Sequence, residues 1–252
     1  MKTGLCVLFG GRSVEHEVSI ISALQAIQNL DAGKYETIPV YMTRNGRFYT
    51  GECLAEIDNY KDPEKLLKMA EEVLLCRSAR ARQLRLAPCG KRLSGKTRRK
   101  RIDIVLPIVH GTNVEDGALQ GFLRTLQIPF AGPDVLASAM GMEKTVMKAM
   151  LERSGIPVLP FVAFSSHMWQ KDSEAVISRI ENDIGYPVII KPSNLGSSIG
   201  IKAANGREEL IEGIYYACRY SLTLMAEKMV TAVKEINCAV LGDHEGQQIS
   251  AC

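Results

Sequence analysis

Apolar residues in the first part of the chain recur at the spacings of strands and helices. Residues 4–9 form an apolar run that predicts a buried strand, and the Gly10-Gly11 pair ends it as a turn. Apolar residues then recur at the i, i+4 and i+7 spacing of one helix face: Ile20, Leu24 and Ile27. Residues 36–41 predict a second strand. A strand, a glycine turn, a helix and a strand in this order predict a right-handed βαβ unit.

Turn signals and apolar spacing predict further elements up to residue 126. Asn45-Gly46 predicts a hairpin between residues 40–41 and 48–49. Asp62-Pro63 predicts the start of a helix, and the residues expected on its apolar face are Leu66, Ala70 and Val73. Residues 103–109 predict a core strand. A helix is expected after it from apolar residues at helical spacing: Leu119, Phe122, Leu123 and Leu126.

The rest of the chain predicts alternating helices and strands around a glycine-rich loop. A helix is expected to open at Met142, with three residues toward a core: Met147, Met150 and Leu151. Two later helices are expected to bury Val176, Ile180 and Ile184, and then Leu210, Ile214 and Ala217. Strands are expected at residues 161–164, 188–190, 199–203, 222–227, 235–241 and 247–252. This alternation is typical of an α/β protein.

The stretch VIIKPSNLGSSIG at residues 188–200 has the composition of a phosphate-binding loop. Its apolar start predicts a strand that ends at Lys191, because Pro192 has no N–H to donate. The small residues after it let backbone N–H groups approach an anion: Gly196, Ser197, Ser198 and Gly200. The lysine adds a point charge for phosphate. It precedes the glycines, so the stretch is not a P-loop, and an ordinary hairpin with a lysine at its mouth is the alternative.

Two other polar segments follow predicted strands, where α/β folds place ligands. The loop from Gly10 to Glu17 follows the first strand, and His110 follows the strand at residues 103–109. Glu115 and Asp116 precede a predicted helix. Acids at that position are favourable with the helix dipole, so a purely structural role would also explain them.

Composition and charge narrow the class of protein. The 252 residues are 46% hydrophobic and 23% charged, as in a globular protein with a sizeable core. The formal net charge of +3 does not indicate a nucleic-acid partner. Residues 77–101 carry repeated Lys and Arg without an acid, which is typical of a solvated loop or hairpin. A nucleic-acid patch is the alternative, but the segment lacks interleaved aromatic residues.

Cysteine spacing and the length of apolar runs indicate the compartment. The seven cysteines form no C-x-x-C pair, which argues against a disulfide framework and a structural zinc site. The apolar run from Leu5 to Phe9 is too short for a signal peptide. No apolar stretch in the sequence approaches the roughly 18 residues that cross a bilayer. We therefore expect a cytoplasmic protein with no membrane partner.

Several segments occur in a characteristic order: GGRSVEHEVS at 10–19, HGTNVEDGALQG at 110–121, SAMGMEK at 138–144, KPSNLGSSIG at 191–200 and EKMV at 227–230. Together they resemble the D-alanine–D-alanine ligase family of the ATP-grasp superfamily, over residues 2–252. Residues 45–101 resemble the longer members, which include vancomycin-resistance ligases of the D-alanine–D-serine type. The resemblance implies a Rossmann-like N-terminal substrate (pre-ATP-grasp) domain at residues 1–135. An ATP-grasp domain with an incomplete C-terminal lobe would occupy residues 136–252.

The resemblance also implies a reaction in peptidoglycan precursor synthesis. ATP phosphorylates the carboxylate of a first D-alanine, and the amine of a second D-amino acid attacks the acyl phosphate. The second substrate stays open between D-alanine and D-serine, with D-lactate as a further possibility. Glu15 matches the family residue that holds the substrate ammonium, Ser197 a serine of the same network, and His110 a histidine near the reacting carboxylate. A homodimer is implied by the resemblance alone.

Nucleotide-binding residues are carried over in the same way. Lys144 and Lys191 match the two lysines that hold ATP phosphates. Backbone N–H groups at three small residues would close over the γ-phosphate: Gly196, Ser198 and Gly200. Glu227 would accept from the adenine amino group, and Glu235 would bind the ribose hydroxyls. The ring edge of the adenine would be read by the segment between them: Lys228, Met229 and Val230.

The sequence departs from the family pattern at identifiable places. Val114 stands where glycine is usual, which is costly if the position needs a positive φ. Glu143 replaces the usual aspartate. Family members continue beyond Cys252, and the Mg²⁺ ligands and a catalytic arginine are expected there. We therefore expect this chain alone to lack ligase turnover. The alternatives are another ATP-grasp carboxylate–amine ligase and a non-catalytic nucleotide- or amino-acid-binding fragment.

Overall fold

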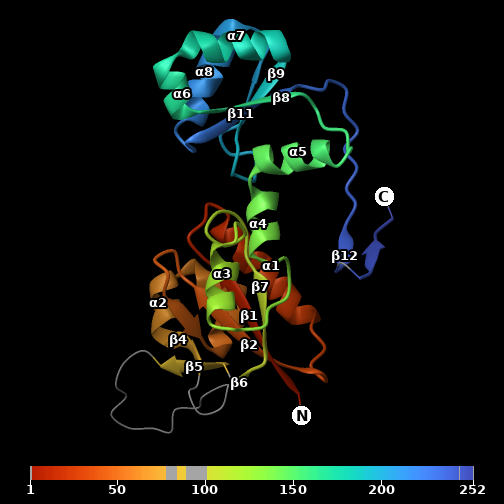
Figure 1. Ribbon diagram of the computed structural model, residues 1–252. Helices are drawn as coiled ribbons and strands as arrows, with labels where there is room; N and C mark the ends of the chain where they lie inside the picture. Colours follow the sequence, from red (N-terminus) through yellow and green to blue (C-terminus); the bar gives the residue numbers. More distant parts are fainter. Residues whose placement is uncertain (1, 78–83, 89–100, 244, 252) are drawn as a thin grey trace.

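The computed structural model describes residues 2–77, 84–88, 101–243 and 245–251. A seven-stranded sheet has the order β6-β5-β4-β3-β2-β1-β7, and a four-stranded sheet has the order β10-β9-β11-β8. Two helices link them, α4 (Val135–Met142) and α5 (Lys144–Arg153). Figure 1 shows α4 between the two sheets and α5 against the lower side of the smaller one. We call the part around the seven-stranded sheet the first lobe and the part around the four-stranded sheet the second lobe.

The first lobe begins with the βαβ unit that the apolar pattern predicts. Its strands are β1 (Thr3–Gly10), β2 (Tyr35–Met42), β3 (Phe48–Thr50), β4 (Glu71–Arg77), β5 (Leu84–Pro88), β6 (Arg101–Ile102) and β7 (Ile104–Ile108). Its helices are α1 (His16–Asn29), η1 (Glu52–Ala55), η2 (Ile57–Lys61), α2 (Pro63–Met69) and α3 (Ala118–Thr125). Strand β1 runs parallel to both β2 and β7, so the carboxyl ends of these three strands meet at one edge of the sheet.

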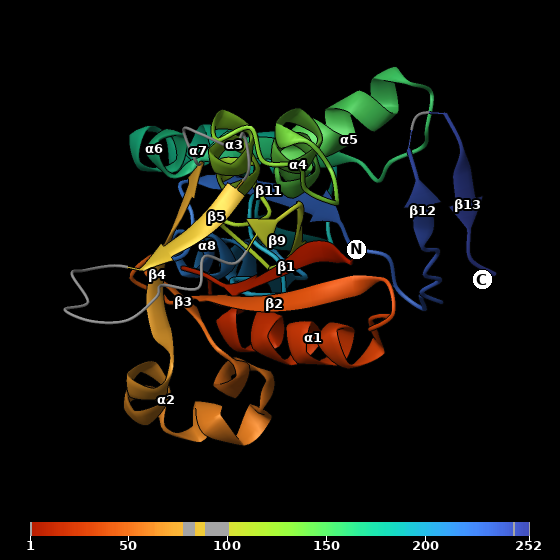
Figure 2. The same ribbon diagram turned by 90° about the horizontal axis from the view of Figure 1, so that it is seen from below.

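Alternate residues of β1 pack on opposite faces of the sheet, as the two-residue period of a strand requires. Cys6 and Leu8 join a core cluster that includes residues of α3. Leu5, Val7 and Phe9 join a second cluster that includes residues of α1. Figure 2 shows α1 and α3 on opposite sides of this sheet. Burying a side chain of this size stabilises the fold by roughly 1.5–3 kcal/mol, so β1 anchors both layers.

The antiparallel half of the first sheet follows the predicted turns with one correction. Strands β2 and β3 form the hairpin predicted at Asn45-Gly46. Helix α2 starts at Pro63, where the Asp62 carboxylate accepts from the Lys65 N–H at 3.1 Å. The prediction that Val73 continues this helix is wrong. Val73 pairs with Phe48 in the sheet, so its apolar side chain is buried by a strand rather than by the helix.

The basic segment at residues 77–101 is described in part. Strand β5 pairs antiparallel with β4, and β6 pairs antiparallel with β5. This pairing agrees with the predicted surface hairpin. Residues 78–83 and 89–100, which carry most of the basic side chains of the alternative nucleic-acid patch, lie outside the described residues.

The second lobe has an all-antiparallel sheet with helices on one face. Its strands are β8 (Phe161–Ser165), β9 (Val188–Pro192), β10 (Lys202–Ala204) and β11 (Thr223–Lys228). Its helices are α6 (Ser166–Lys171), α7 (Ser173–Asp183) and α8 (Arg207–Ala217). The predicted inward residues Ile180, Leu210 and Ile214 are fully buried in the core. Beyond it, β12 (Val240–Gly242) and β13 (Gln247–Ile249) form a separate exposed hairpin around the predicted turn.

Helix α5 differs from the amphipathic core helix that the methionine spacing predicts. The helix expected from Met142 is two helices, because Glu143 takes an extended backbone between α4 and α5. Met150 is 46% exposed, whereas Lys148 is buried. The reason is the face that α5 covers. Figure 1 shows α5 on the side of the smaller sheet opposite α7 and α8, and Glu227 on that side pairs with Lys148.

Candidate active site

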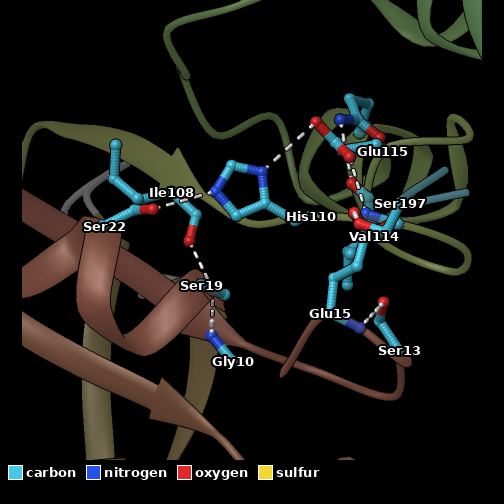
Figure 3. Close-up of polar contacts among 12 residues, drawn as sticks. Gly10, Ser13, Glu15, Ser19, Ser22, Ile108, His110, Val114, Glu115 and Ser197 are labelled. Carbon is cyan, nitrogen blue, oxygen red and sulfur yellow. Dashed lines mark hydrogen bonds and ion pairs between the residues drawn. The ribbon is translucent and has the colours of Figure 1, made fainter. Parts of the chain in front are cut away.

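Three loops meet at Glu15, the residue that precedes helix α1. The Ser197 hydroxyl donates to Glu15 Oε1 across a separation of 182 residues, which joins the two lobes. Gly196 is equally close, because a Cβ added there would lie 3.2 Å from Glu15 Oε2. Figure 3 shows Glu15 and Ser197 together, with His110 and Glu115 nearby. The structure thus brings two of the predicted substrate residues into direct contact.

Buried polar groups hold the loop that carries Glu15. The Glu15 N–H donates to Ser13 Oγ at 3.0 Å. The fully buried Ser19 accepts from the Gly10 N–H at 2.7 Å and donates to the Ile108 carbonyl at 2.6 Å (Figure 3). Ser19 therefore ties the ends of β1 and β7 to the first turn of α1. This serine was not among the site residues predicted from the sequence, although it lies in the EHEVS segment.

The same loop is held from β2 by a buried histidine. His16 is 4% exposed, and its Nδ1 lies 2.7 Å from the Gly11 carbonyl oxygen. Its Nε2 lies 2.9 Å from the Tyr41 hydroxyl. A carbonyl only accepts, so Nδ1 carries the proton and Nε2 accepts from the tyrosine in the neutral ring. Burial raises the pKa of Tyr41, which keeps this hydroxyl a donor.

His110 stands at the end of β7 and contacts the first helix. Its Nε2 lies 3.2 Å from Ser22 Oγ, and its Nδ1 lies 3.8 Å from Glu115 Oε1. The other oxygen of Glu115 accepts from the Gly111 N–H at 2.6 Å. Gly111 has a φ of +87°, and a Cβ added to it would lie 2.6 Å from Glu15 Oε2. Only glycine therefore fits between the His110 strand and Glu15.

The acidic residues after His110 have separable roles. Asp116 accepts from the Asn113 N–H at 2.6 Å and from the Ala118 N–H at 3.2 Å. These bonds agree with a structural role for this acid at the start of the helix. The cost foreseen for Val114 does not arise, because the positive φ belongs to its neighbour Asn113 at 67°. Val114 is fully buried, and its side chain packs toward Gly11.

A second polar cluster forms on the face of the smaller sheet that α5 covers. Val188 and Ile190 point into the core with Leu224 and Ala226, so the period of two places Lys191 and Glu227 on the opposite face. Lys191 lies opposite Met225 and Glu227 lies opposite Ile189 in the ladder, which makes the two charged residues diagonal neighbours. The Lys191 ammonium donates to Glu227 Oε2.

Lys148 completes this cluster from α5. Its ammonium donates to Glu227 Oε1 and lies 5.3 Å from the centre of the Phe161 ring. Burial alone would raise the pKa of the Glu227 carboxyl, but the hydrogen bonds from Lys148 and Lys191 outweigh it and lower the pKa. Lys148 was not among the site residues predicted from the sequence. Its i, i+4 spacing from Lys144, one helical turn away on the same face, was the available signal.

Lys144 begins helix α5 beside the glycine loop. Its backbone N–H donates to the Ser193 carbonyl at 2.9 Å, and its ammonium donates to the Leu195 carbonyl. Burial lowers the pKa of Lys144, and the charge of Lys191 lowers it further. The carboxylates of Glu15 and Glu227 act on it in the opposite direction. Lys144 thus lies within the electrostatic reach of both polar clusters.

The glycine loop itself has an unusual backbone. Ser197 and Ser198 both have positive φ, at 50° and 57°. Each left-handed residue costs roughly 1–2 kcal/mol, a cost that proteins carry mainly at functional sites. Gly200 has a φ of +74°, and a Cβ there would lie 2.6 Å from Pro192 Cγ. The strand predicted at 199–203 consequently starts later, at Lys202.

The predicted adenine segment leaves the end of β11. The Lys228 ammonium donates to the Tyr186 carbonyl at 2.9 Å, and the Met229 N–H donates to the Pro187 carbonyl at 3.0 Å. Val230 is 46% exposed. Glu235 lies in an exposed segment without regular secondary structure. The structure thus places Glu227 through Met229 at the end of β11 on the second lobe, and Glu235 in the exposed segment that follows.

Two family models match the chain in the order of its lobes. The model described as D-ala D-ala ligase N-terminus matches residues 4–133, and the model described as D-ala D-ala ligase C-terminus matches residues 150–252. The chain belongs to the D-alanine–D-alanine ligase family. The resemblance stated from the motifs is confirmed. The α/β fold, with a Rossmann-like first part and an ATP-grasp part after it, is confirmed as well.

Curated members of the ligase family align over most of the chain. A D-alanine–D-alanine ligase of Natranaerobius thermophilus is 38% identical over 237 residues, which are 94% of this chain and 62% of that protein. One of Acetivibrio thermocellus is 34% identical over 257 residues, 97% of this chain and 66% of that protein. The chain spans about two thirds of the length of the curated relatives it matches.

Solved structures of the ligase family have the same fold. The D-alanine–D-alanine ligase of Coxiella burnetii aligns with a TM-score of 0.80 at 32% identity, over 99% of this chain and 67% of that chain. The VanG D-Ala:D-Ser ligase of Enterococcus faecalis aligns with a TM-score of 0.79 at 29% identity, over 99% of this chain and 68% of that chain.

The described residues fit a phosphate ligand better than a metal ion. Lys144 and Lys191 bring two ammonium groups to the glycine loop, and ammonium groups are donors that suit phosphate oxygens. Within the described ranges, no group of three or more His, Cys, Asp or Glu side chains is placed to hold a metal ion. No helix there is long and apolar enough to cross a membrane.

Proposed function

We propose that the chain supplies the D-alanine site and part of the ATP site of an ATP-dependent ligase. The ligase would join D-alanine to a second D-amino acid for peptidoglycan precursor synthesis. The observation that carries this proposal is the hydrogen bond from Ser197 to Glu15, because it unites the motif after β1 with the glycine loop after β9. A carboxylate at this junction suits the ammonium of an amino acid, and the loop with its lysines suits a phosphate.

In this proposal Glu15 binds the ammonium of the first D-alanine. Ser197 keeps the Glu15 carboxylate oriented, because it already donates to one of its oxygens. His110 would stand beside the substrate carboxylate, held at Ser22 and Glu115. ATP would transfer its γ-phosphoryl group to this carboxylate. The amine of the second substrate would then attack the carbonyl carbon of the acyl phosphate and expel phosphate. Stabilising charge that accumulates on the transferring group is the main task of such a site.

The nucleotide would lie against the second lobe. Lys144 and Lys191 would hold its phosphates, and backbone N–H groups of the loop would face the γ-phosphate: Gly196, Ser198 and Gly200. Glu227 to Val230 would contact the adenine, and Glu235 the ribose. Within the described residues, no group of three or more His, Cys, Asp or Glu side chains is placed to hold the Mg²⁺ ion that the family resemblance implies.

The wider assignments rest on family membership. We propose D-alanine or D-serine as the second substrate, with the VanG D-Ala:D-Ser ligase among the structural neighbours as the support for D-serine. We also propose the domain division at residues 1–135 and 136–252, a homodimer and a cytoplasmic location.

Calorimetric titration of the chain with a non-hydrolysable ATP analogue and with D-alanine tests the proposal. We expect both to bind, the analogue more weakly in Lys191→Ala and D-alanine more weakly in Glu15→Gln. L-alanine serves as the control ligand for the amino-acid site. Binding of the analogue without any binding of D-alanine would instead favour another ATP-grasp carboxylate–amine ligase. Binding of neither ligand would refute the proposal.

A further inference from the structure

Lys148 is a buried cation that the proposed substrate contacts do not use. The residue is 8% exposed, and its ammonium bonds to Glu227 Oε1 beneath the Phe161 ring. Taking a lysine out of water is strongly unfavourable unless an opposite charge pairs with it. Glu227 supplies that charge. A lysine kept at such a position calls for a reason beyond packing, since an apolar residue would fill the space without the cost.

The two lysines on Glu227 differ in their access to a ligand. The Lys191 side chain is 21% exposed and stands where β9 runs into the glycine loop. The Lys148 side chain is 10% exposed and comes from the middle of α5. An incoming phosphate therefore reaches Lys191 first. Lys191 can turn toward it, whereas Lys148 remains packed against Glu227.

We infer that Lys148 is a positioning residue that keeps Glu227 ionised and in place when Lys191 leaves it for a nucleotide phosphate. The inference deepens the proposed function and rests on it. With Lys148 present, the departure of Lys191 leaves a neutral buried pair. Without Lys148, the same movement leaves a buried carboxylate alone, which is a large penalty. The carboxyl can escape that penalty only by taking up a proton.

The charges around Glu227 make this proton uptake specific to Lys148. Helix α5 presents Lys144 and Lys148, and β9 presents Lys191. Strand β8, the other neighbour of β11, consists of residues 161–165 and carries no ionisable side chain. On β11 itself, the Lys228 ammonium is bonded to the Tyr186 carbonyl. Once Lys148 is removed and Lys191 has moved, Lys144 is the cation that remains among the described neighbours of Glu227, and its ammonium is bonded to the Leu195 carbonyl.

The test is calorimetric titration of wild type and Lys148→Met with a non-hydrolysable ATP analogue between pH 6.0 and 8.5. Lys202→Met is the matched control, because it removes an exposed lysine that lies over the Tyr216 ring, away from the cluster. We expect Lys148→Met to bind roughly 10- to 100-fold more weakly than wild type at pH 8.5. This ratio should fall toward one at pH 6.0. The ratio to wild type removes the titration of the nucleotide itself.

Buffers of different ionisation enthalpy measure the proton directly. Lys148→Met should take up more protons than wild type on binding, and Lys202→Met should match wild type. The double variant Lys148→Met/Glu227→Gln lacks the buried charge, so it should fold and bind the analogue as Glu227→Gln alone does. This comparison stands even if Lys148→Met fails to fold.

The outcomes separate the two proposals. If wild type binds no ATP analogue, the nucleotide part of the proposed function and the inference about Lys148 both fail. If wild type binds and Lys148→Met shows the same affinity ratio at every pH, only the inference about Lys148 fails. A double variant that binds more weakly than Glu227→Gln would show that Lys148 acts otherwise than through Glu227, and would also overturn it.

Discussion

Gly111→Ala tests whether the three loops around Glu15 are as closely packed as the structure shows. Gly111 has a φ of +87°, and an alanine Cβ would lie 2.2 Å from Ser13 Oγ and 2.6 Å from Glu15 Oε2. The left-handed backbone costs an alanine about 1–2 kcal/mol. Moving Ser13 aside breaks its bond to the Glu15 N–H, which costs about 1 kcal/mol more. The expected loss in free energy of unfolding is therefore about 2–3 kcal/mol.

Urea denaturation followed by circular dichroism measures this loss. The single tryptophan, Trp169, is buried in the second lobe, so its fluorescence reports separately on the lobe without the substitution. Gly121→Ala in helix α3 is the control, because an added Cβ there would have no heavy atom within 4 Å apart from its chain neighbours and the backbone of the same helix. It should gain about 0.5–1 kcal/mol.

Ligand binding gives the second part of the same prediction. The displaced Glu15 carboxylate should weaken D-alanine binding at least tenfold in Gly111→Ala, while the affinity for an ATP analogue stays within twofold. Calorimetry measures both. A Gly111→Ala variant that is as stable as wild type and binds D-alanine normally would refute the packing argument.

Three further predictions concern single residues. Ser197→Ala removes the hydrogen bond to the charged Glu15 and should weaken D-alanine binding about tenfold, as measured by calorimetry. The affinity for the ATP analogue should not change, and an equal loss of affinity for both ligands would contradict the role of Ser197 in orienting Glu15. Leu210→Ala, in the core, should cost about 2–5 kcal/mol in chemical denaturation, whereas Leu222→Ala, 76% exposed, should stay within about 0.5 kcal/mol. The pKa of the Glu227 carboxyl is lower in the folded chain than its ordinary value of 4.5. The ion pairs of Glu227 with Lys148 and Lys191 therefore contribute their full stability above pH 4.5, and this stability is lost as the pH falls through the lowered pKa. The stability of wild type relative to Glu227→Gln, from thermal unfolding between pH 7 and 3, should therefore be constant above about pH 4.5 and fall below it; a decline beginning near neutral pH would contradict the lowered pKa.

The apolar pattern predicted the cores because burial on a strand or helix follows the geometry of one element. Ile20 and Leu24 on α1, and Leu210 and Ile214 on α8, are buried as their spacing predicts. The apolar pattern failed for helix α5, where the element that the helix packs against determines which of its side chains are buried. Helix α5 has enough methionines to suggest a core face, but it covers a sheet face with a buried glutamate, so Lys148 points inward instead.

The residues of the candidate site could be predicted from the sequence only where they match a motif of the family. No local pattern links Glu15 to Ser197, since 182 residues separate them, and only the resemblance placed them in one network. Ser19 and His16 were missed because their roles arise from the ends of other strands, at Ile108 and Tyr41. Such contacts depend on the tertiary fold, which the sequence pattern of one helix or strand does not predict.

The bond between Ser197 and Glu15 also couples the unfolding of the two lobes. Its donor belongs to a loop of the second lobe and its acceptor to a loop of the first. A ligand that contacts both residues binds only the docked pair, so it stabilises docking by mass action. Saturating D-alanine should therefore bring the melting temperatures of the two lobes closer together than they are in its absence.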